Sequence, residues 1–172
     1  MKNYAETLAR NSRVKEFLYE KKKNPKGFVP EVVFEQDSFF GILMNIFRRY
    51  DHTAKGYIIV DGKRVVWTMF SWNSDILKFH KIRMPENESL RGYGYPTFLF
   101  LASYLYLKDN MKNTENVEVI ANLTGKGRNI AAKILGVSEG KIKSYRIEKQ
   151  KKQYAINFES YEKKIKKTWG FR

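Results

Sequence analysis

A short glycine-rich segment, Arg91-Gly92-Tyr93-Gly94-Tyr95-Pro96, carries the residue types best suited to binding an anion. Two glycines one residue apart let the backbone pass close to a ligand, and the flanking residues predict a strand before the segment and an apolar helix after it. A helix that begins after such a loop directs backbone N–H groups and the positive end of its dipole at negative charge. The segment predicts a phosphate-binding loop or, alternatively, an ordinary chain reversal.

Few other residues offer metal-binding or nucleophilic chemistry. The chain has no cysteine, which excludes disulfides and thiolate sites, and its two histidines, His52 and His80, lie far apart in the sequence. No HExxH-like spacing occurs, so we expect no protein-bound metal. For proton transfer, His80 has the ionisation range best matched to neutral pH, and Glu86 and Glu88 follow it closely. Each of these three residues can also be an ordinary strand or loop residue without a catalytic role.

The composition describes a folded and strongly basic chain. Its 172 residues, 42% of them hydrophobic, are enough for one domain with a hydrophobic core. The net charge of +15 is concentrated at the ends, because residues 1–30 carry 8 basic and 3 acidic groups and residues 141–172 carry 11 and 3. Such ends attract polyanions, for example nucleic acid or an acidic protein surface, although a solvated basic surface explains the same pattern.

The sequence predicts neither a signal peptide nor a membrane span. Residues 1–6 lack the basic-then-apolar layout of a signal peptide. The longest apolar run, residues 95–107, is shorter than the roughly 20 residues needed to cross a bilayer. We therefore expect a cytoplasmic protein that does not associate with membranes.

Hydrophobic periodicity predicts strands and helices in alternation. Helices are expected over residues 4–22, 37–50, 96–108 and 129–135, and strands over 31–35, 57–60, 64–70, 76–84, 117–122, 142–149 and 152–158. Asp61-Gly62, between two β-branched runs, predicts a hairpin turn. The helix over 96–108 is apolar nearly all round and should be buried. We expect residues 1–27 to form a basic helical arm and residues 28–172 to form the domain, with a basic hairpin and tail at its C-terminal end.

This order of elements, with the glycine loop, resembles the GCN5-related N-acetyltransferase (GNAT) superfamily over about residues 31–160. In that family a loop of the form Arg/Gln-x-x-Gly-x-Gly/Ala binds the pyrophosphate of acetyl-coenzyme A, and Arg91, Gly92 and Gly94 match it. Asn122 and the run Asn129-Ile130-Ala131-Ala132 resemble the end of the family's next strand and the start of its next helix. The resemblance implies an α/β (α+β) fold with a mixed, mostly antiparallel central sheet flanked by helices.

The resemblance also implies roles for individual residues. The strand before the loop would pair with the pantetheine arm of acetyl-CoA, and its amides would polarise the thioester carbonyl. The cofactor-binding residues expected on this basis are Ile82, Met84, Arg91, Gly92, Tyr93, Gly94, Thr97, Asn122 and Asn129. Glu86 or His80 would accept the proton that the attacking amine loses.

Two positions depart from the family pattern. Pro96 stands where Gly or Ala is usual and has no N–H to donate, although proline is well tolerated in the first turn of a helix. Gly136 stands where the family often has a tyrosine that protonates the departing thiolate. The acid would then be Tyr104 or Tyr145, or the thiolate would leave unaided. Both departures also fit a chain that carries out no acetyl transfer.

Two further interpretations concern the loop and the basic ends. Gly92-x-Gly94-x-x-Thr97 half matches a dinucleotide fingerprint, but hairpins before and after it argue against a doubly wound parallel sheet. In residues 145–154 and 163–169, aromatic side chains alternate with lysine and arginine. Lysines attract phosphates and aromatics can stack on bases, but core aromatics with outer lysines produce the same alternation.

Three functions are compatible with these observations. The leading one is an acetyl-CoA-dependent N-acyltransferase that acts on an amine of an acidic or nucleic-acid-associated substrate. The second is a GNAT-like enzyme that modifies DNA bases, as some phage enzymes do. The third is a catalytically inactive GNAT fold that serves as a binding or structural component of a virion or nucleoprotein.

Overall fold

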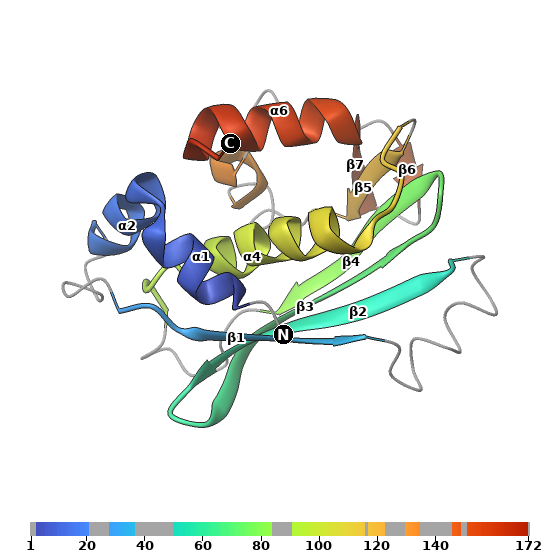
Figure 1. Cartoon of the computed structure of the whole chain (residues 1–172). Helices are drawn as coiled ribbons and strands as arrows, with labels where there is room; N and C mark the ends of the chain where they lie inside the picture. Colours follow the sequence, from blue (N-terminus) through green and yellow to red (C-terminus); the bar gives the residue numbers. More distant parts are fainter. Residues whose placement is uncertain are drawn as a thin grey trace.

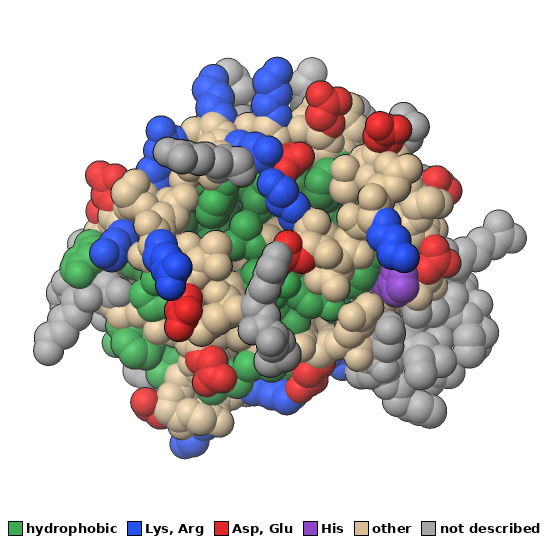
Figure 2. Space-filling model, viewed as in Figure 1, with side chains coloured by type: hydrophobic (Ala, Val, Ile, Leu, Met, Phe, Trp, Pro, Cys, Tyr) green, Lys and Arg blue, Asp and Glu red, His purple; other side chains and the backbone are tan. Residues whose placement is uncertain are grey.

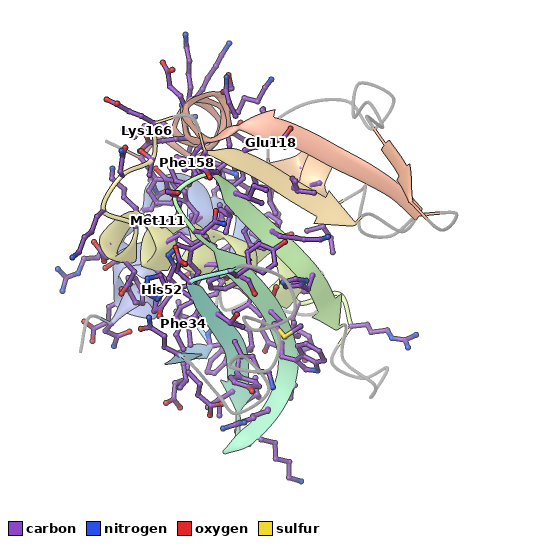
Figure 3. All side chains as sticks on the ribbon, turned by 90° about the vertical axis from the view of Figure 1, so that its right-hand side faces the viewer. Phe34, His52, Met111, Glu118, Phe158 and Lys166 are labelled. Carbon is purple, nitrogen blue, oxygen red and sulfur yellow. The ribbon has the colours of Figure 1, made fainter. Side chains whose placement is uncertain are left out.

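The computed structural model describes residues 3–20, 28–36, 50–83, 91–115, 117–122, 130–134, 146–148 and 151–171. The labelled helices are α1 (Tyr4–Arg10), α2 (Ser12–Tyr19), α4 (Tyr95–Asn110) and α6 (Phe158–Trp169). The strands are β1 (Glu31–Gln36), β2 (His52–Val60), β3 (Lys63–Trp72), β4 (Ile76–Arg83), β5 (Glu118–Asn122), β6 (Arg146–Glu148) and β7 (Lys151–Asn157). Residues 130–134 are also helical. These helices lie on one side of a twisted sheet (Figures 1 and 3).

The described strands form one sheet in the order β1-β2-β3-β4-β5-β7-β6. β4 and β5 pair in parallel, and every other neighbouring pair is antiparallel. α4 connects the two parallel strands, as a crossover between parallel strands requires. The expected α/β (α+β) fold with a mixed, mostly antiparallel sheet is therefore confirmed.

Local turn chemistry determines the hairpin between β2 and β3. Asp61 and Gly62 both have positive φ, 50° and 71°, and Val60 pairs directly with Lys63. Positive φ at both central residues is the geometry of a two-residue type I′ turn, for which Asp-Gly is well suited. The predicted turn is thus present, although β2 begins at His52, five residues before the strand predicted over residues 57–60.

The core lies between the sheet and α4, most of whose side chains are buried, as the sequence predicted. Gly56 in β2 allows this close packing, because a Cβ there would lie 2.6 Å from the Phe34 ring and 3.3 Å from Leu99 Cδ1. The stacked rings of Phe79 and Phe100, with centroids 4.4 Å apart, connect β4 to α4.

The N-terminal helices belong to the same core. The single helix expected over residues 4–22 is divided at Asn11, whose extended backbone ends α1 and whose side chain caps α2. Leu8, Phe17 and Leu18 are buried in the cluster that also contains the α4 side chains. The helical part of the expected arm therefore packs onto the domain.

A C-terminal helix replaces part of the expected basic tail. α6 begins directly after β7, with Asn157 as its N-cap and Gly170, at φ 70°, as its C-cap. Its buried residues, Phe158, Tyr161, Ile165 and Trp169, recur at helical spacing. The run of lysines between them lies on the outside of a packed amphipathic helix.

The remaining predicted elements are present in part. β6 and β7 pair antiparallel, with Glu148 opposite Lys151, and they correspond to the strands predicted over 142–149 and 152–158. The helix predicted over 129–135 is observed over residues 130–134. The helix predicted over 37–50 lies outside the described residues, except for Tyr50, which is not helical.

Candidate active site

The glycine loop leads directly into α4. Gly92 and Gly94 have φ values of 91° and 81°, a conformation that side-chain-bearing residues rarely adopt, and Gly94 is the N-cap of α4. Tyr93 is half-buried, and its ring stacks on that of Tyr95 with the centroids 5.2 Å apart. Arg91 is exposed at the start of the loop. The backbone conformation at the two glycines thus explains why this segment needs them.

The first turn of α4 has no side-chain cap among the described residues. Phe98 N–H donates to the Gly94 carbonyl at 3.1 Å, which closes the first turn of the helix. Pro96 has no N–H, so Tyr95 and Thr97 carry the first amides of α4, and no hydrogen bond from either occurs within the described part of the chain. These amides, with the dipole of a 16-residue helix, form an electropositive position.

The tyrosine at the start of α4 does not add negative charge there. Burial raises the pKa of Tyr95 to about 12, and the neighbouring Tyr93 and Asp61 raise it further in the same direction. Its phenol is therefore neutral near pH 7. An anion at the first turn of α4 meets no phenolate.

The two parallel strands, β4 and β5, separate near the carboxyl end of β4. β4 pairs with β5 from Ile76 to Phe79, and the pairing ends where Phe79 meets Ala121. Residues 81–83 of β4 continue to pair with β3, whereas Asn122 of β5 pairs with Gln153 of β7. Among the described strands, none pairs with residues 81–83 of β4 on the side away from β3. An extended ligand could pair with that edge as a further strand does.

A β-bulge marks the point of separation. Met69 of β3 pairs with Lys81, but the next residue, Phe70, pairs with Phe79, so His80 is an extra residue in β4. A bulge interrupts strand pairing and re-aims a side chain, and bulges are frequent next to active sites. His80 is one of the two expected proton acceptors, and it is half-buried at this bulge.

Two buried hydroxyl groups hold the imidazole of His80. Its Nε2 is hydrogen-bonded to Ser71 Oγ at 2.9 Å, and Ser71 Oγ is 2.7 Å from Thr53 Oγ1. Ser71 and Thr53 are almost completely buried, and the Tyr50 ring contacts His80 edge-on with a centroid distance of 5.8 Å. Sequence reasoning missed all three partners. The contact arises from the pairing of β2, β3 and β4, which no local pattern encodes.

The loop and the separation of β4 from β5 lie at the same end of the sheet. A crossover helix runs antiparallel to the strands that it connects, so α4 begins near the carboxyl end of β4. The Phe79–Phe100 stack sets the distance between β4 and the start of α4. Tyr95 is five residues before Phe100, or about 8 Å along the helix axis. His80, Asn122 and the glycine loop are therefore grouped together.

The other expected site residues divide into three groups. Ile82 lies in β4 opposite Thr68, within the segment that continues past the separation. Thr97 is buried in the first turn of α4. Met84, Glu86, Asn129 and Tyr145 lie outside the described residues.

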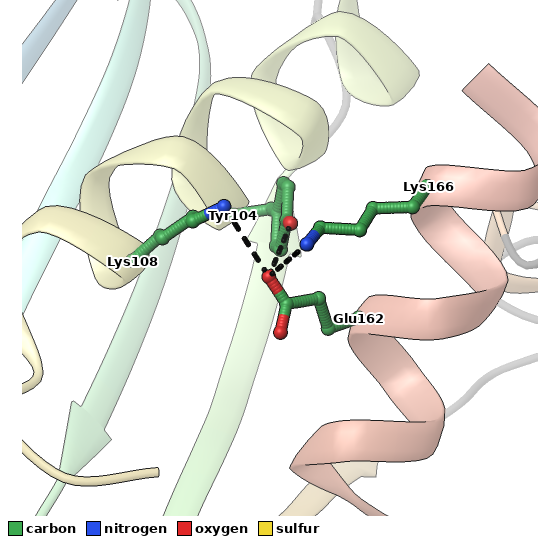
Figure 4. A network of polar contacts seen from close by, with 4 residues as sticks. All are labelled: Tyr104, Lys108, Glu162 and Lys166. Carbon is green, nitrogen blue, oxygen red and sulfur yellow. Dashed lines mark hydrogen bonds and ion pairs between the residues drawn. The ribbon is translucent and has the colours of Figure 1, made fainter. Parts of the chain in front are cut away.

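Tyr104 cannot serve as the acid for a departing thiolate. Its side chain is fully buried on α4, and its hydroxyl donates a 3.0 Å hydrogen bond to Glu162 of α6 (Figure 4). Burial raises the pKa of Tyr104, and the Glu162 charge raises it further. This expectation was wrong because the periodicity of α4 does not reveal which of its aromatics faces another helix.

Glu162 is the centre of a polar cluster between α4 and α6. Lys108 Nζ and Lys166 Nζ lie 3.4 and 3.3 Å from its Oε1 (Figure 4). Burial opposes ionisation of Glu162, but hydrogen bonds from Tyr104 and Lys166 and the charge of Lys108 outweigh it and hold its pKa below the ordinary value. Glu162 is therefore ionised, its charge is balanced by the two lysines, and its role is structural.

The described surface also has a hollow of about 430 Å³, lined by Thr114, Glu115, Asn157, Phe158, Glu159 and Glu162. It lies beyond the C-terminal end of α4, whereas the glycine loop is at the N-terminal end. A 16-residue helix is about 24 Å long, so the hollow is remote from the candidate site. Its three carboxylates do not suit a phosphate-containing ligand.

Within the described ranges, no three His, Cys, Asp or Glu side chains are grouped closely enough to hold a metal ion. No described helix is both long enough and apolar enough to cross a bilayer.

Comparisons with known proteins do not assign a family. No protein-family model matches the chain, and no curated protein is similar enough to it to be identified as a relative. The chemistry of the site must therefore be inferred from its geometry.

Proposed function

We propose that the protein is an acetyl-CoA-dependent N-acyltransferase with a GNAT-type site, acting on an amine of an acidic or nucleic-acid-associated substrate in the cytoplasm. The observation that carries the proposal is the separation of β4 from β5 at the His80 bulge, at the end of the sheet where α4 begins. This arrangement combines a strand edge that no described strand covers at residues 81–83 with an electropositive helix end, which suits a cofactor with an extended amide arm and a pyrophosphate.

The residues present fit the phosphate end of acetyl-CoA. Gly92 and Gly94 have no side chain to obstruct a phosphate, and their positive φ values turn the loop into the first turn of α4. The N–H groups of Tyr95 and Thr97 are positioned to donate to phosphate oxygens. Arg91 lies at the loop entrance and can add a charged hydrogen bond.

The strand edge fits the pantetheine arm. The backbone of residues 81–83 that faces away from β3 can exchange hydrogen bonds with the amides of the arm, as in β-strand addition. When bound, acetyl-CoA supplies the acetyl group as a thioester. An N–H of the bulged segment is then available to stabilise negative charge on the carbonyl oxygen.

His80 is the proposed proton acceptor. It lies at the bulge, and Ser71 and Thr53 fix the orientation of its ring. An imidazole with near-neutral basicity can take a proton from an ammonium substrate and leave the free amine as nucleophile. With Tyr104 excluded, we expect solvent or a residue outside the described ranges to protonate the thiolate.

Binding of acetyl-CoA to the nucleic-acid-free protein tests this proposal. Titration calorimetry should give a Kd on the order of micromolar for the wild-type protein. Gly94→Trp should weaken binding at least about 100-fold, since the side chain occupies the phosphate position. Gly62→Trp is the matched control, because Gly62 also has positive φ and a Cβ there would meet no atom within 4 Å.

The control separates blocking of the loop from general destabilisation. Both substitutions strain a positive-φ position, but only the one at residue 94 should affect acetyl-CoA. Equal loss in both variants would mean that the glycine loop has no special role. A folded wild-type protein that produces no binding heat would contradict the acyltransferase proposal, and a binding or structural role would then be the better explanation.

A further inference from the structure

We propose that the outer face of α6 binds the phosphate backbone of duplex nucleic acid. This lysine face consists of Lys163, Lys164 and Lys167. Lys163 and Lys167 are exposed and Lys164 is partly exposed, while the opposite side of the helix is buried. The proposal is independent of acetyl-CoA binding, because the face does not include the glycine loop or β4.

Neighbouring carboxylates cancel only part of the charge of the lysine face. Glu162 is engaged by Lys108 and Lys166 on the inner side of the helix, and no ion pair to the three lysines occurs among the described residues. Glu159 lies in the first turn, away from Lys167 but four residues before Lys163, so it offsets part of the charge at that end of the face. Figure 2 shows Lys and Arg side chains along the upper rim over α6, with acidic ones nearer the end at which the helix begins.

Arg13 extends the positive charge beyond the end of α6. Its Nη1 donates to the carbonyl oxygens of Lys167 and Thr168 at 2.6 and 2.9 Å. These bonds use the guanidinium as a cap for the last turn of the helix, but its charge remains next to Lys167. A cationic group at a helix C-terminus also stabilises the helix.

The lysine face is held on a rigid support. Trp169 is buried, and its Nε1 donates to the Ile134 carbonyl at 2.9 Å, while Asn11 Nδ2 donates to the Trp169 carbonyl at 2.9 Å. The Phe17 ring packs edge-on against Trp169. α6 therefore presents its lysines from a fixed backbone.

The spacing of the lysines matches a phosphate backbone. Lys163 and Lys167 are four residues apart, or about 6 Å along the helix axis. Duplex DNA carries one phosphate per about 3.4 Å of each strand, so the face spans roughly two phosphates. Each lysine can displace condensed counterions from the nucleic acid on binding.

Other anionic partners fit less well. Protein interfaces are depleted in lysine and need apolar or aromatic centres, but the exposed large hydrophobic residues of the described chain are Tyr19 and Phe28, neither of them on α6. Insertion into an anionic membrane would need the apolar side of α6, which is buried in the core.

Base stacking is also excluded for this face. Trp169, which the sequence offered as a stacking residue, is only 5% exposed, and Phe158 and Tyr161 are buried as well. Single-stranded nucleic acids are usually bound with the help of such aromatics. Recognition by α6 should therefore be through the backbone of a duplex, without sequence preference.

Salt-dependent binding of a labelled random duplex of about 20 base pairs tests the proposal, measured by fluorescence anisotropy between about 50 and 200 mM salt. The variant K163Q/K167Q should reduce the slope of log K against log salt by about 1.8, since each contact contributes roughly 0.9. At about 100 mM salt, affinity should fall roughly 10- to 60-fold. Glutamine is a good helix former, so α6 should remain folded, which circular dichroism can check.

The control variant K63Q/K112Q removes the same charge from exposed positions on other elements. It should lose less than half as much of the salt slope. Equal losses in the two variants would overturn the proposal and indicate attraction by net charge alone. Competition by polyglutamate or by phosphatidylserine vesicles that equals competition by unlabelled duplex would also overturn it.

Discussion

The helices of this protein begin in two different ways. α1, α2 and α6 begin at Asn3, Asn11 and Asn157, whose Oδ1 atoms accept hydrogen bonds from first-turn N–H groups at 3.2, 3.1 and 2.8 Å. α4 begins at Gly94, and no side chain of the described residues caps it. A cap is worth about 1 kcal/mol, and the longest described helix lacks one.

The difference lies in how the first turns are stabilised. α4 is stabilised by its buried side chains, so it tolerates first-turn amides that no described side chain caps. The shorter terminal helices carry charged outer faces and depend on caps and on a few buried residues. The first-turn amides of α4 adjoin the glycine loop and have no hydrogen-bond acceptor among the described residues, whereas those of the other three helices are satisfied in part by an asparagine.

Among the Asn-capped helices, the largest effect is expected from removing the Trp169 side chain, which anchors α6. Trp169→Ala removes a buried indole and its hydrogen bond to Ile134, so the free energy of unfolding should fall by about 3–5 kcal/mol. Urea denaturation measures this loss. Trp169→Phe should cost less, because the packing against Phe17 is retained. A loss below about 1 kcal/mol in the alanine variant would show that α6 is not anchored through Trp169.

Replacing Gly94 by asparagine should make the start of α4 resemble those of the Asn-capped helices. In Gly94→Asn the asparagine tolerates positive φ, and its amide occupies the space over the first turn. Acetyl-CoA affinity should fall about tenfold, or about 1.4 kcal/mol. Calorimetric titration measures this change, with Gly62→Asn as the control at another positive-φ position. Unchanged affinity in Gly94→Asn would argue against phosphate binding at this turn.

Removing the N-cap of α6 should lower stability and leave acetyl-CoA affinity unchanged. Asn157→Ala deletes the acceptor for the Ser160 N–H, so the protein should lose about 1 kcal/mol of stability. Its acetyl-CoA affinity should stay the same, because α6 begins at the far end of α4. Thermal denaturation with and without acetyl-CoA separates the two effects. A weakened cofactor affinity would contradict the separation of roles between the helices.

The smallest expected effect is a pH dependence that comes from Glu162. Its pKa is lower in the folded protein than its ordinary value of 4.5, so its ionisation stabilises the fold above pH 4.5. That contribution is lost as the pH falls through the folded-state pKa. Wild type should therefore lose more stability than Glu162→Gln between about pH 5 and pH 3, by less than about 1 kcal/mol. Parallel stability curves would contradict this assignment.

The sequence predicted the features that depend on neighbouring residues. Asp61-Gly62 specified the hairpin turn, and the uninterrupted apolar run predicted burial of α4, because turn conformation and helix hydrophobicity are local properties. The sequence also contains a pattern that predicts α6, although we did not expect this helix. Four apolar residues have helical spacing between Asn157 and Gly170: Phe158, Tyr161, Ile165 and Trp169. The lysines among them suggested a basic tail instead.

The parts that could not be predicted depend on pairing between strands. The bulge at His80 exists because β4 has one residue more than β3 across that stretch, and Ser71 reaches the imidazole only through that register. Asn11, at the break between α1 and α2, likewise donates to the carbonyl of Trp169, 158 residues away. Such contacts are set by the tertiary fold, which a single sequence does not display.

Amide hydrogen exchange with and without acetyl-CoA tests the central claim most directly. Acetyl-CoA should slow exchange at the Tyr95 and Thr97 amides and in residues 81–83, where the loop and the strand edge would hold the cofactor. The first turns of α1, α2 and α6 should exchange at unchanged rates. Protection at the start of α4 and along β4 alone is the result we predict. No protection there, or equal protection at the capped helices, would contradict the claim that α4 begins at a phosphate site.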